Sequence, residues 1–475
     1  MSSAPPQRNT VATLIVVSLA LFMVVLDNLI VTVALPAIRT DLGATLESLE
    51  WTINAYTLAF AVVLLPASAL ADRFGRRRLF LGGLALFTVA SAAAALAPTT
   101  GALVVARALQ GVGGAVVAPL TLTLLAGAFP AEKRGAALGI WSGISGMGVA
   151  LGPLVGGAVV EGISWHWIFW INVPIGLVLI PVAARILRES HGPSTTLDLP
   201  GVGLAAAGLF GLVFGLVRGQ GEGWGSPLIV ASLAGGVALL AAFVGWERRA
   251  EAPMLPVSLF RRRSFAVTNA VSFFMYFGTF GSIFLLTQVL QLVMGYSPLQ
   301  AGLRMLVWTG STMLVAPLAG IFAERRGARG FMVAGLSLQA GALAWFAATV
   351  AVGQQFSGLI VPFAMAGVGM ALVFAPSASA LLGAVAPEQA GQASGANNAI
   401  REVGGVFGVA VLSTVFAGSG SFASPLAYVD GVQPALWVGA AVVAIGAAIA
   451  TALPRRERAA AAGADASAAG TLQAA

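Results

Sequence analysis

The sequence consists of long apolar runs that alternate with short polar segments. A helix needs about 20 mostly apolar residues in a row to cross the hydrocarbon core of a bilayer, and we count fourteen such runs. They are too long for the strands of a membrane barrel and lack the strand period of two. The sequence therefore predicts an all-α integral membrane protein with 14 transmembrane helices. The runs cover residues 11–36, 51–71, 79–97, 102–129, 136–160, 167–187, 199–217, 227–246, 265–294, 301–323, 331–351, 356–385, 397–418 and 433–453.

The composition excludes several other classes of protein. Only 9% of the residues are charged, against about 25% in a soluble domain. The chain has no cysteine and two histidines, which excludes disulfides, thiolate chemistry and a histidine metal cluster. The formal charge of +7 does not indicate a nucleic-acid partner, because the arginines lie in short clusters between apolar runs. We therefore expect no metal, no cofactor other than a coupling proton, and no nucleic acid.

The basic residues orient the predicted helices. If the N-terminus is cytoplasmic, 20 of the 25 basic residues fall in cytoplasmic segments, and only Arg39, Arg218 and Arg304 fall in outer ones. The positive-inside rule predicts this asymmetry for the cytoplasmic membrane, and an even number of spans puts both termini inside. The apolar run from Val11 is longer than that of a signal peptide, so we expect it to be the first transmembrane helix.

Two loops indicate that the chain is duplicated. In each loop an acid is followed by basic residues and a glycine: Asp72-Arg73-Phe-Gly75-Arg76-Arg77 after the second run, and Glu324-Arg325-Arg326-Gly327 after the tenth. Duplicated six-helix halves are a transporter architecture, with the substrate path between the halves. The predicted parts are a six-helix half over 1–190, two inserted central helices with their linkers over 191–264, a second six-helix half over 265–454, and a disordered tail over 455–475.

Six motifs occur in the order known from one family. Together they resemble the major facilitator superfamily, and within it the fourteen-span drug:proton antiporters. Glu402 departs from the family pattern, which more usually has glutamine there. The motifs are Leu26–Pro36, Asp72–Arg77, Arg107–Gly113, Gly148–Gly157, Trp167–Gly176 and Gln291–Gly302.

The resemblance implies two sets of structural residues in a transporter that works by alternating access. The gating residues, which lock one state by pairing between helices, are Asp72, Arg73, Gly75, Arg76, Arg77, Glu324 and Arg325. The antiporter motif consists of Gly148, Gly152, Pro153, Gly156 and Gly157. Small residues at a spacing of four let neighbouring helices approach closely, and the proline adds a kink. The motif is thus expected to form a tight, bendable seam.

Four ionisable residues lie inside predicted spans, where charge is costly and usually functional. Asp27 and Arg107 fall at similar depth when 1.5 Å is counted per residue, which allows an ion pair between them. We assign proton coupling to Asp27, Arg107 and Glu402, and we expect Arg401 to be a structural or lipid-facing anchor. The alternatives are a purely structural ion pair and a Glu402 side chain that extends to the membrane interface.

The expected substrate site combines aromatic and amide side chains. Tyr276 and Phe280 belong to an aromatic-rich ninth run, which suits an apolar, drug-like ligand, although packing and lipid contact would explain the same aromatics. The expected substrate-binding residues are Asn28, Gln110, Tyr276, Phe280, Gln288 and Gln291.

The resulting hypothesis is proton-driven export of a hydrophobic or amphipathic small molecule by a monomer. The expected partners are this molecule, protons and membrane lipid. Import by symport, or uniport of a small polar solute, is the alternative within the superfamily. A membrane-bound transferase is disfavoured because the charged residues are topogenic, and the chain lacks the phosphate-binding glycine loop of an ATP-driven pump.

Overall fold

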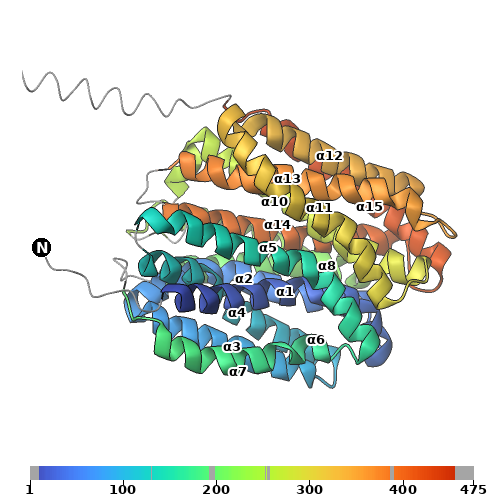
Figure 1. The fold of residues 1–475 in the computed structure, drawn as a ribbon. Helices are drawn as coiled ribbons and strands as arrows, with labels where there is room; N and C mark the ends of the chain where they lie inside the picture. Colours follow the sequence, from blue (N-terminus) through green and yellow to red (C-terminus); the bar gives the residue numbers. More distant parts are fainter. Residues whose placement is uncertain are drawn as a thin grey trace, which may run out of the picture.

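The computed structural model describes residues 10–129, 131–191, 198–251, 253, 257–385 and 390–454. These residues form helices and contain no strand, which agrees with the all-α prediction (Figure 1). The predicted tail, 455–475, lies outside the described residues. The first half holds α1 (Thr10–Leu42), α2 (Leu46–Phe74), α3 (Arg76–Ala95), α4 (Thr100–Ala128), α5 (Ala131–Gly162), α6 (Trp167–Trp170) and α7 (Asn172–Ile186).

The remaining helices form a central pair and the second half. Two central helices, α8 (Leu199–Glu222) and α9 (Pro227–Glu247), precede the short helix η1 (Val257–Arg261). The second half holds α10 (Arg263–Gln288), η2 (Val289–Val293), α11 (Pro298–Arg326), α12 (Ala328–Thr349), η3 (Phe356–Leu359), α13 (Ile360–Gly383), α14 (Ala390–Ser419) and α15 (Pro425–Ala450).

Within the described residues, twelve helical stretches are long and apolar enough to cross a membrane. They coincide with twelve of the fourteen predicted runs. The other two runs fall on α2 and α5, which are helices of 29 and 32 residues but are not among the twelve. In α5, a shorter apolar stretch covers Leu151–Gly162.

The same packing pattern occurs twice. In the first half α4 packs against α2 and α3, α1 against α5, and α3 against α7; in the second, α13 packs against α11 and α12, α10 against α14, and α12 against α15. The halves meet where α5 packs against α11 and α14 against α2, and Figure 1 shows the blue-to-teal and yellow-to-red helices as two adjacent bundles. Each pair in one half therefore has a counterpart in the other.

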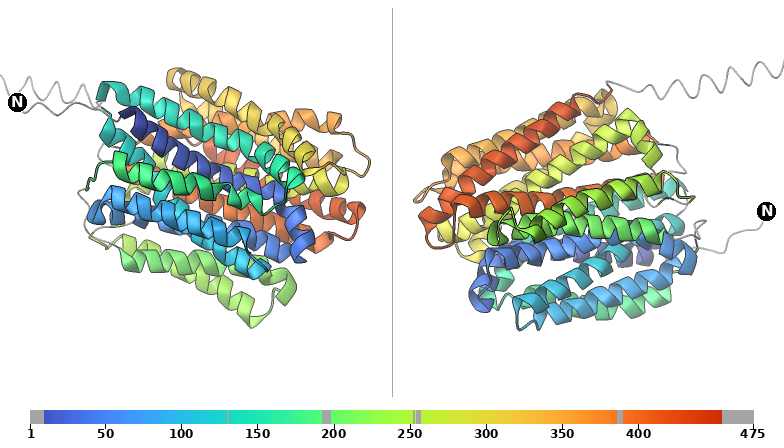
Figure 2. Two further views of the ribbon diagram at one scale, coloured as in Figure 1. Left: turned by 60° about the horizontal axis from the view of Figure 1, so that its bottom comes forward. Right: turned by 180° about the vertical axis from the view of Figure 1, so that it is seen from behind.

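The central helices lie outside the two bundles. α9 packs against α8, and α8 packs against α2 of the first half and α14 of the second. Seen from behind, the green pair covers the boundary between blue and red helices (Figure 2). Apolar side chains fill this junction, with Leu58 from α2, Val213 and Val217 from α8, and Val406 and Ala410 from α14.

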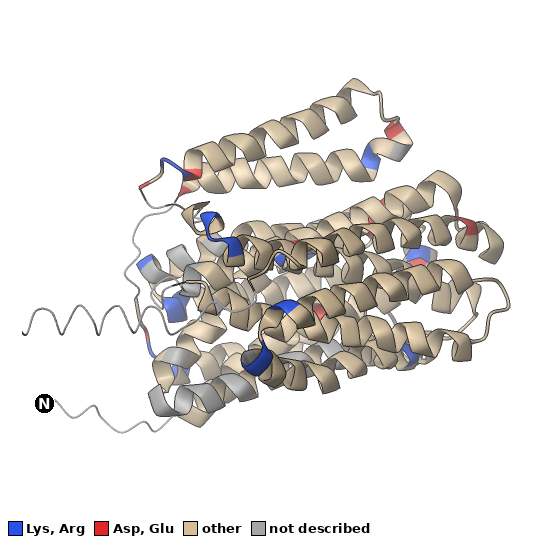
Figure 3. Ribbon diagram, turned by 90° about the horizontal axis from the view of Figure 1, so that it is seen from above, with Lys and Arg blue, Asp and Glu red and all other residues tan. Residues whose placement is uncertain are grey.

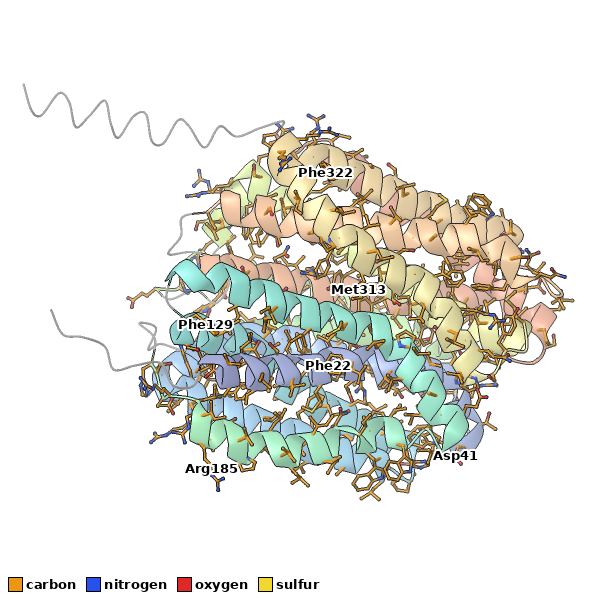
Figure 4. The ribbon with its side chains drawn as sticks, in the orientation of Figure 1. Phe22, Asp41, Phe129, Arg185, Met313 and Phe322 are labelled. Carbon is orange, nitrogen blue, oxygen red and sulfur yellow. The ribbon has the colours of Figure 1, made fainter. Side chains whose placement is uncertain are left out.

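The two ends of the bundle differ in charge. We call the end at which α1, α3 and α10 begin the arginine-rich end, because blue segments gather there in Figure 3. Figure 4 shows Phe129 and Arg185 at this end and Asp41 at the opposite end. Hydrogen bonds join the halves at the opposite end, from Gln291 Nε2 to Val33 O at 2.9 Å and from Leu299 N to Glu161 Oε2 at 3.0 Å. The opposite end is therefore closed in this structure.

Local sequence explains where α2 begins. Thr45 caps α2, since its hydroxyl accepts a hydrogen bond from Ser48 N at 3.2 Å. The helix thus starts at Leu46, five residues before the predicted apolar run, which begins at residue 51. As a consequence Glu50 lies inside the helix and is buried.

Candidate functional site

A cavity of about 150 Å³ lies between the two halves. Helices α1, α2, α4 and α5 line one side, and α10, α11, α13 and α14 line the other. Its wall is mostly apolar, which favours an apolar ligand with a few specific polar contacts. The aromatic lining residues are Tyr56, Phe60, Tyr276, Phe280, Trp308 and Phe374.

Few polar groups reach this cavity. Glu402 is the one carboxylate among the lining residues, and Asn28 lies across from it on α1. Asn28 Oδ1 and Trp308 Nε1 are buried and make no hydrogen bond within the described part of the chain. A buried polar atom without a partner is costly, so both atoms are available to a polar group of a ligand.

Arg401 packs against two residues of the cavity wall, Tyr276 and Phe374. Its guanidinium donates to the Tyr276 hydroxyl at 2.6 Å, and its central carbon lies 4.5 Å from the Tyr276 ring centre and 4.3 Å from that of Phe374. Of the two alternatives expected for Arg401, these contacts favour the structural anchor over the lipid-facing one. The side chain is partly buried and packs on two lining aromatic rings through cation–π contacts.

A buried ion pair lies beside the cavity. Arg107 donates to Asp27 Oδ2 at 2.5 Å, and both side chains are fully buried. Asp27 Oδ1 accepts from Asn172 at 2.7 Å and from Gln110 at 3.1 Å. Because α1, α4 and α7 contribute these residues, the structure brings together three segments that are far apart in the sequence.

The rest of this network holds Arg107 in place. Its Nε donates to Thr52 O at 3.2 Å, and Gln110 accepts from its guanidinium at 3.0 Å while donating to Ser91 at 2.7 Å. One guanidinium nitrogen, Nη2, has no partner within the described residues. Charge-assisted hydrogen bonds of this kind fix geometry as well as adding energy.

Tyr56 separates the ion pair from the cavity. Its ring lies 4.2 Å from the central carbon of Arg107, and its hydroxyl donates to Val24 O at 3.3 Å. Tyr56 lines the cavity, whereas Asp27 and Arg107 do not. The two sites are thus adjacent, with one aromatic ring between them.

The predicted gate lies at the arginine-rich end. Gly75 joins α2 to α3 with φ of 104°, a conformation that favours glycine. Glu189, after α7, accepts from Arg77 N at 2.9 Å and Arg78 N at 3.2 Å, and Arg77 also donates to Ala184 O. These contacts all stay within the first half.

The second loop of the repeat has the same backbone form. Gly327 joins α11 to α12 with φ of 89°. Arg73 and Arg325 are exposed, whereas the side chains of Asp72 and Glu324 lie outside those described. The helix-to-helix turn at a glycine is therefore a feature that both halves share.

The α5 glycines form two close helix contacts. A Cβ at Gly152 would lie 2.9 Å from Leu29 Cβ, and one at Gly156 would lie 2.8 Å from Ile30 O, so both face α1. Gly148 faces α1 as well. Gly157 instead lies against the backbone of Pro298 in α11, and Gly302 of α11 lies against Pro153. The motif therefore packs α5 on α1 and on the second half at once.

Three residues expected to bind substrate do not line the cavity. Gln110 belongs to the Asp27 network, Gln288 bonds to Phe284 O within its own helix, and Gln291 bonds across the halves to Val33 O. The structure contradicts a direct wall position for each, because backbone and side-chain partners occupy these amides. Asn28, Tyr276 and Phe280 do line the cavity.

Sequence reasoning missed several site residues. Tyr56 and Trp308 line the cavity, and Asn172 binds Asp27. Asn172 stands in a recognised motif, so its polarity inside a predicted span was an available signal. Tyr56 and Trp308 gave none, because single aromatic residues are common in membrane helices.

Comparison with known proteins gives consistent results. Residues 17–409 match the Major Facilitator Superfamily. The chain is 39% identical to the cephamycin export protein CmcT of Amycolatopsis lactamdurans, over 88% of this chain and 87% of that protein. It is 37% identical to the tetracenomycin C resistance and export protein of Streptomyces glaucescens, over 85% and 76%. It is 36% identical to the multidrug resistance protein Stp of Mycobacterium tuberculosis, over 86% and 76%.

Proposed function

The chain belongs to the major facilitator superfamily and is a multi-pass membrane transporter rather than an enzyme, and from this premise we propose that it exports drug-like molecules in exchange for protons. The cargo class follows from the apolar, aromatic cavity and from the named exports and resistances of its relatives. Both halves of this chain line the cavity, which supports our proposal that a monomer carries out transport.

The observation that carries the proposal is the Asp27–Arg107 pair next to the cavity. A fully buried carboxylate at the interface of three helices, paired to arginine, is costly unless it has a function. Protonation of Asp27 removes its charge and frees Arg107, whose position is coupled to Tyr56 and through Tyr56 to the cavity. Proton binding at Asp27 and cargo binding in the cavity can therefore exclude one another, so that proton uptake accompanies cargo release.

Alternating access supplies the rest of the mechanism. The opposite end is closed through α1, α5, η2 and α11, so in this state cargo enters from the arginine-rich end. We assign that end to the cytoplasm, which makes both termini cytoplasmic. Opening of the opposite end then requires the α5–α11 and α2–α14 contacts to rearrange.

We further propose fourteen spans and membership of the drug:proton antiporter subgroup. The helices α2 and α5 run parallel to the other twelve and are as long as they are, and both line the central cavity. Two spans outside the twelve bring the total to fourteen. The inserted pair α8 and α9 accounts for the excess over two six-helix halves.

Glu402 gives the cavity a preference for cations. Its carboxylate lies among Tyr56, Tyr276 and Phe374, and aromatic faces together with a carboxylate suit a lipophilic ammonium group. Arg401 partly offsets this charge. Symport or uniport of a polar solute fits less well, because such a solute needs more hydrogen-bonding groups than this wall offers.

The proposal is tested by transport in everted vesicles. We expect pH-gradient-driven uptake of a lipophilic dye, with Asp27→Asn abolishing it while the protein still inserts. Asp430→Asn, which changes an exposed carboxylate on α15, is the matched control and should transport normally. Full active transport by Asp27→Asn would exclude Asp27 as the proton site.

The cargo preference has a separate test. Glu402→Gln should lower transport of a cationic dye by about tenfold, the effect of a partly desolvated charge pair, and spare a matched neutral dye. Equal retention of both dyes would show that Glu402 does not contact cargo.

A further inference from the structure

Glu50 is a buried carboxyl at the closed end of the bundle that no step above uses. It lies one turn into α2, and only 3% of the residue is exposed. α2 packs against α14, Ser413 of α14 lies next to the Glu50 side chain, and Glu50 Oε2 has no partner within the described residues. Glu50 therefore sits in the contact between the two halves, which we call the α2–α14 seam.

The charges near this seam are engaged elsewhere. Arg218 binds Glu47 at 3.1 Å and Glu222 at 3.3 Å, and Arg107 binds Asp27. The arginines of α3 lie at the other end. Glu50 thus has no counter-charge in the described part of the chain. The charged residues of the surrounding elements are Glu47 on α2, Arg218 and Glu222 on α8, Arg107 on α4, Asp27 on α1, and Arg401 and Glu402 on α14.

Ser413 of α14 does not balance a charge on Glu50. Its hydroxyl already donates to Val409 O of its own helix at 2.5 Å. A neutral hydroxyl supplies no counter-charge to an ionised carboxylate, so the closed seam accommodates Glu50 in its neutral form.

The inserted helix α8 keeps this seam dry. Val213 and Val217 pack against Leu58 of α2 and Val406 of α14. Thr414, next to Ser413, donates to Leu216 O of α8 at 3.0 Å. An ionised carboxylate without a counter-charge is strongly disfavoured in such surroundings.

We propose that Glu50 is a proton-sensitive switch on opening, neutral while the α2–α14 seam is closed and releasing its proton to water when the seam opens. The seam then closes again only after Glu50 has taken up a proton from the side to which it opened. The proposed function matters here only for identifying that side as the outer face. The inserted helices thereby gain a role, since they shield this group.

The test measures opening directly and needs no cargo. The chain has no cysteine, so spin labels can be placed at Ala102→Cys on α4 and Ala423→Cys beyond α14, both exposed at the opposite end. The background Asp27→Asn/Glu402→Gln removes the other two carboxyls. Distance distributions in lipid nanodiscs from pH 5 to 9 should show the longer, open distance increasing with pH.

Adding Glu50→Gln should abolish this pH dependence and leave the seam closed throughout. Glu47→Gln, one turn away and half-exposed, is the control and should keep the dependence.

Two results would overturn the inference: no pH dependence in the background variant, or full pH dependence after Glu50→Gln. Both results come from the distance measurement and need no transport assay. A chain that opens with pH through Glu50 but moves no dye would contradict the proposed antiport and leave this inference intact.

Discussion

Replacing both members of the Asp27–Arg107 pair should restore stability without restoring transport. Both side chains are fully buried, and their contact is 2.5 Å long. Asp27→Asn leaves the Arg107 charge buried without a counter-charge, with Thr52 O, Gln110 and the new amide oxygen as neutral acceptors. Removing one partner of a buried pair costs about 3–5 kcal/mol, so this variant should be strongly destabilised.

The reverse change should cost less. After Arg107→Gln, Asp27 can take up a proton and become neutral, and Asn172 and Gln110 still donate to it. The loss is then that of hydrogen bonds to a charged group, about 1.5–3 kcal/mol. The two single variants are therefore not equivalent, although each removes the same ion pair.

The double variant places two neutral amides in the site. No unpaired charge remains buried, so a coupling energy of about 2 kcal/mol or more should appear in the double-mutant cycle. Equilibrium unfolding in mixed micelles with increasing SDS measures stability, and everted vesicles measure gradient-driven dye uptake. Uptake should be absent from the double variant, because no group at this position binds a proton.

Two outcomes would refute this reasoning. Active uptake by the double variant would show that the pair is only structural. Unchanged stability of Asp27→Asn would show that Arg107 does not depend on the charge of Asp27. Asp430→Asn, which changes an exposed carboxylate, is the control for the general effect of removing one acidic side chain.

Three further predictions concern the loops and helix contacts. Gly75→Ala should lower stability by about 1–2 kcal/mol, because the residue has φ of 104°, whereas Gly82→Ala, with open space around it, should be neutral in the same unfolding assay. Gly156→Ala should slow dye uptake severalfold, since a Cβ there would lie 2.8 Å from Ile30 O; an unchanged rate would argue against a tight α1–α5 contact. Glu189→Gln should slow turnover more than it weakens dye binding, and a change in binding alone would contradict a gating role.

The fold could be predicted because each membrane-spanning helix can be recognised from its own stretch of sequence. A run of apolar residues long enough to span the bilayer has one stable conformation, since lipid cannot satisfy an open backbone. Twelve of the fourteen runs match spans in the structure, and the repeated glycine turns at Gly75 and Gly327 mark the duplication. α2 begins five residues before the predicted apolar run, because Thr45 caps residues 46–50, which include Glu47 and Glu50, into the helix.

The part of the site that could be predicted is the one that places ionisable residues inside the membrane, where a charge is energetically unfavourable. Asp27 and Arg107 were recognised because each is an ionisable residue inside an apolar run, and helix rise alone put them at one depth. The sequence did not show in which direction each side chain points around its helix. Gln288 and Gln291 were expected in the cavity, yet one bonds to its own helix and the other to α1.

The sequence by itself thus determined the class of protein, the positions of most of its membrane-spanning helices, and the charged residues that must be paired. Only the tertiary structure decided that Tyr56 stands between the ion pair and the cavity, that Arg401 faces inward, and that Glu50 lies in the α2–α14 seam. The physical reason is that lipid and protein interior are equally apolar, so a membrane helix carries little contrast between its faces. Neighbouring residues on a helix point about 100° apart, and only packing against particular neighbours selects which of them meets the cavity.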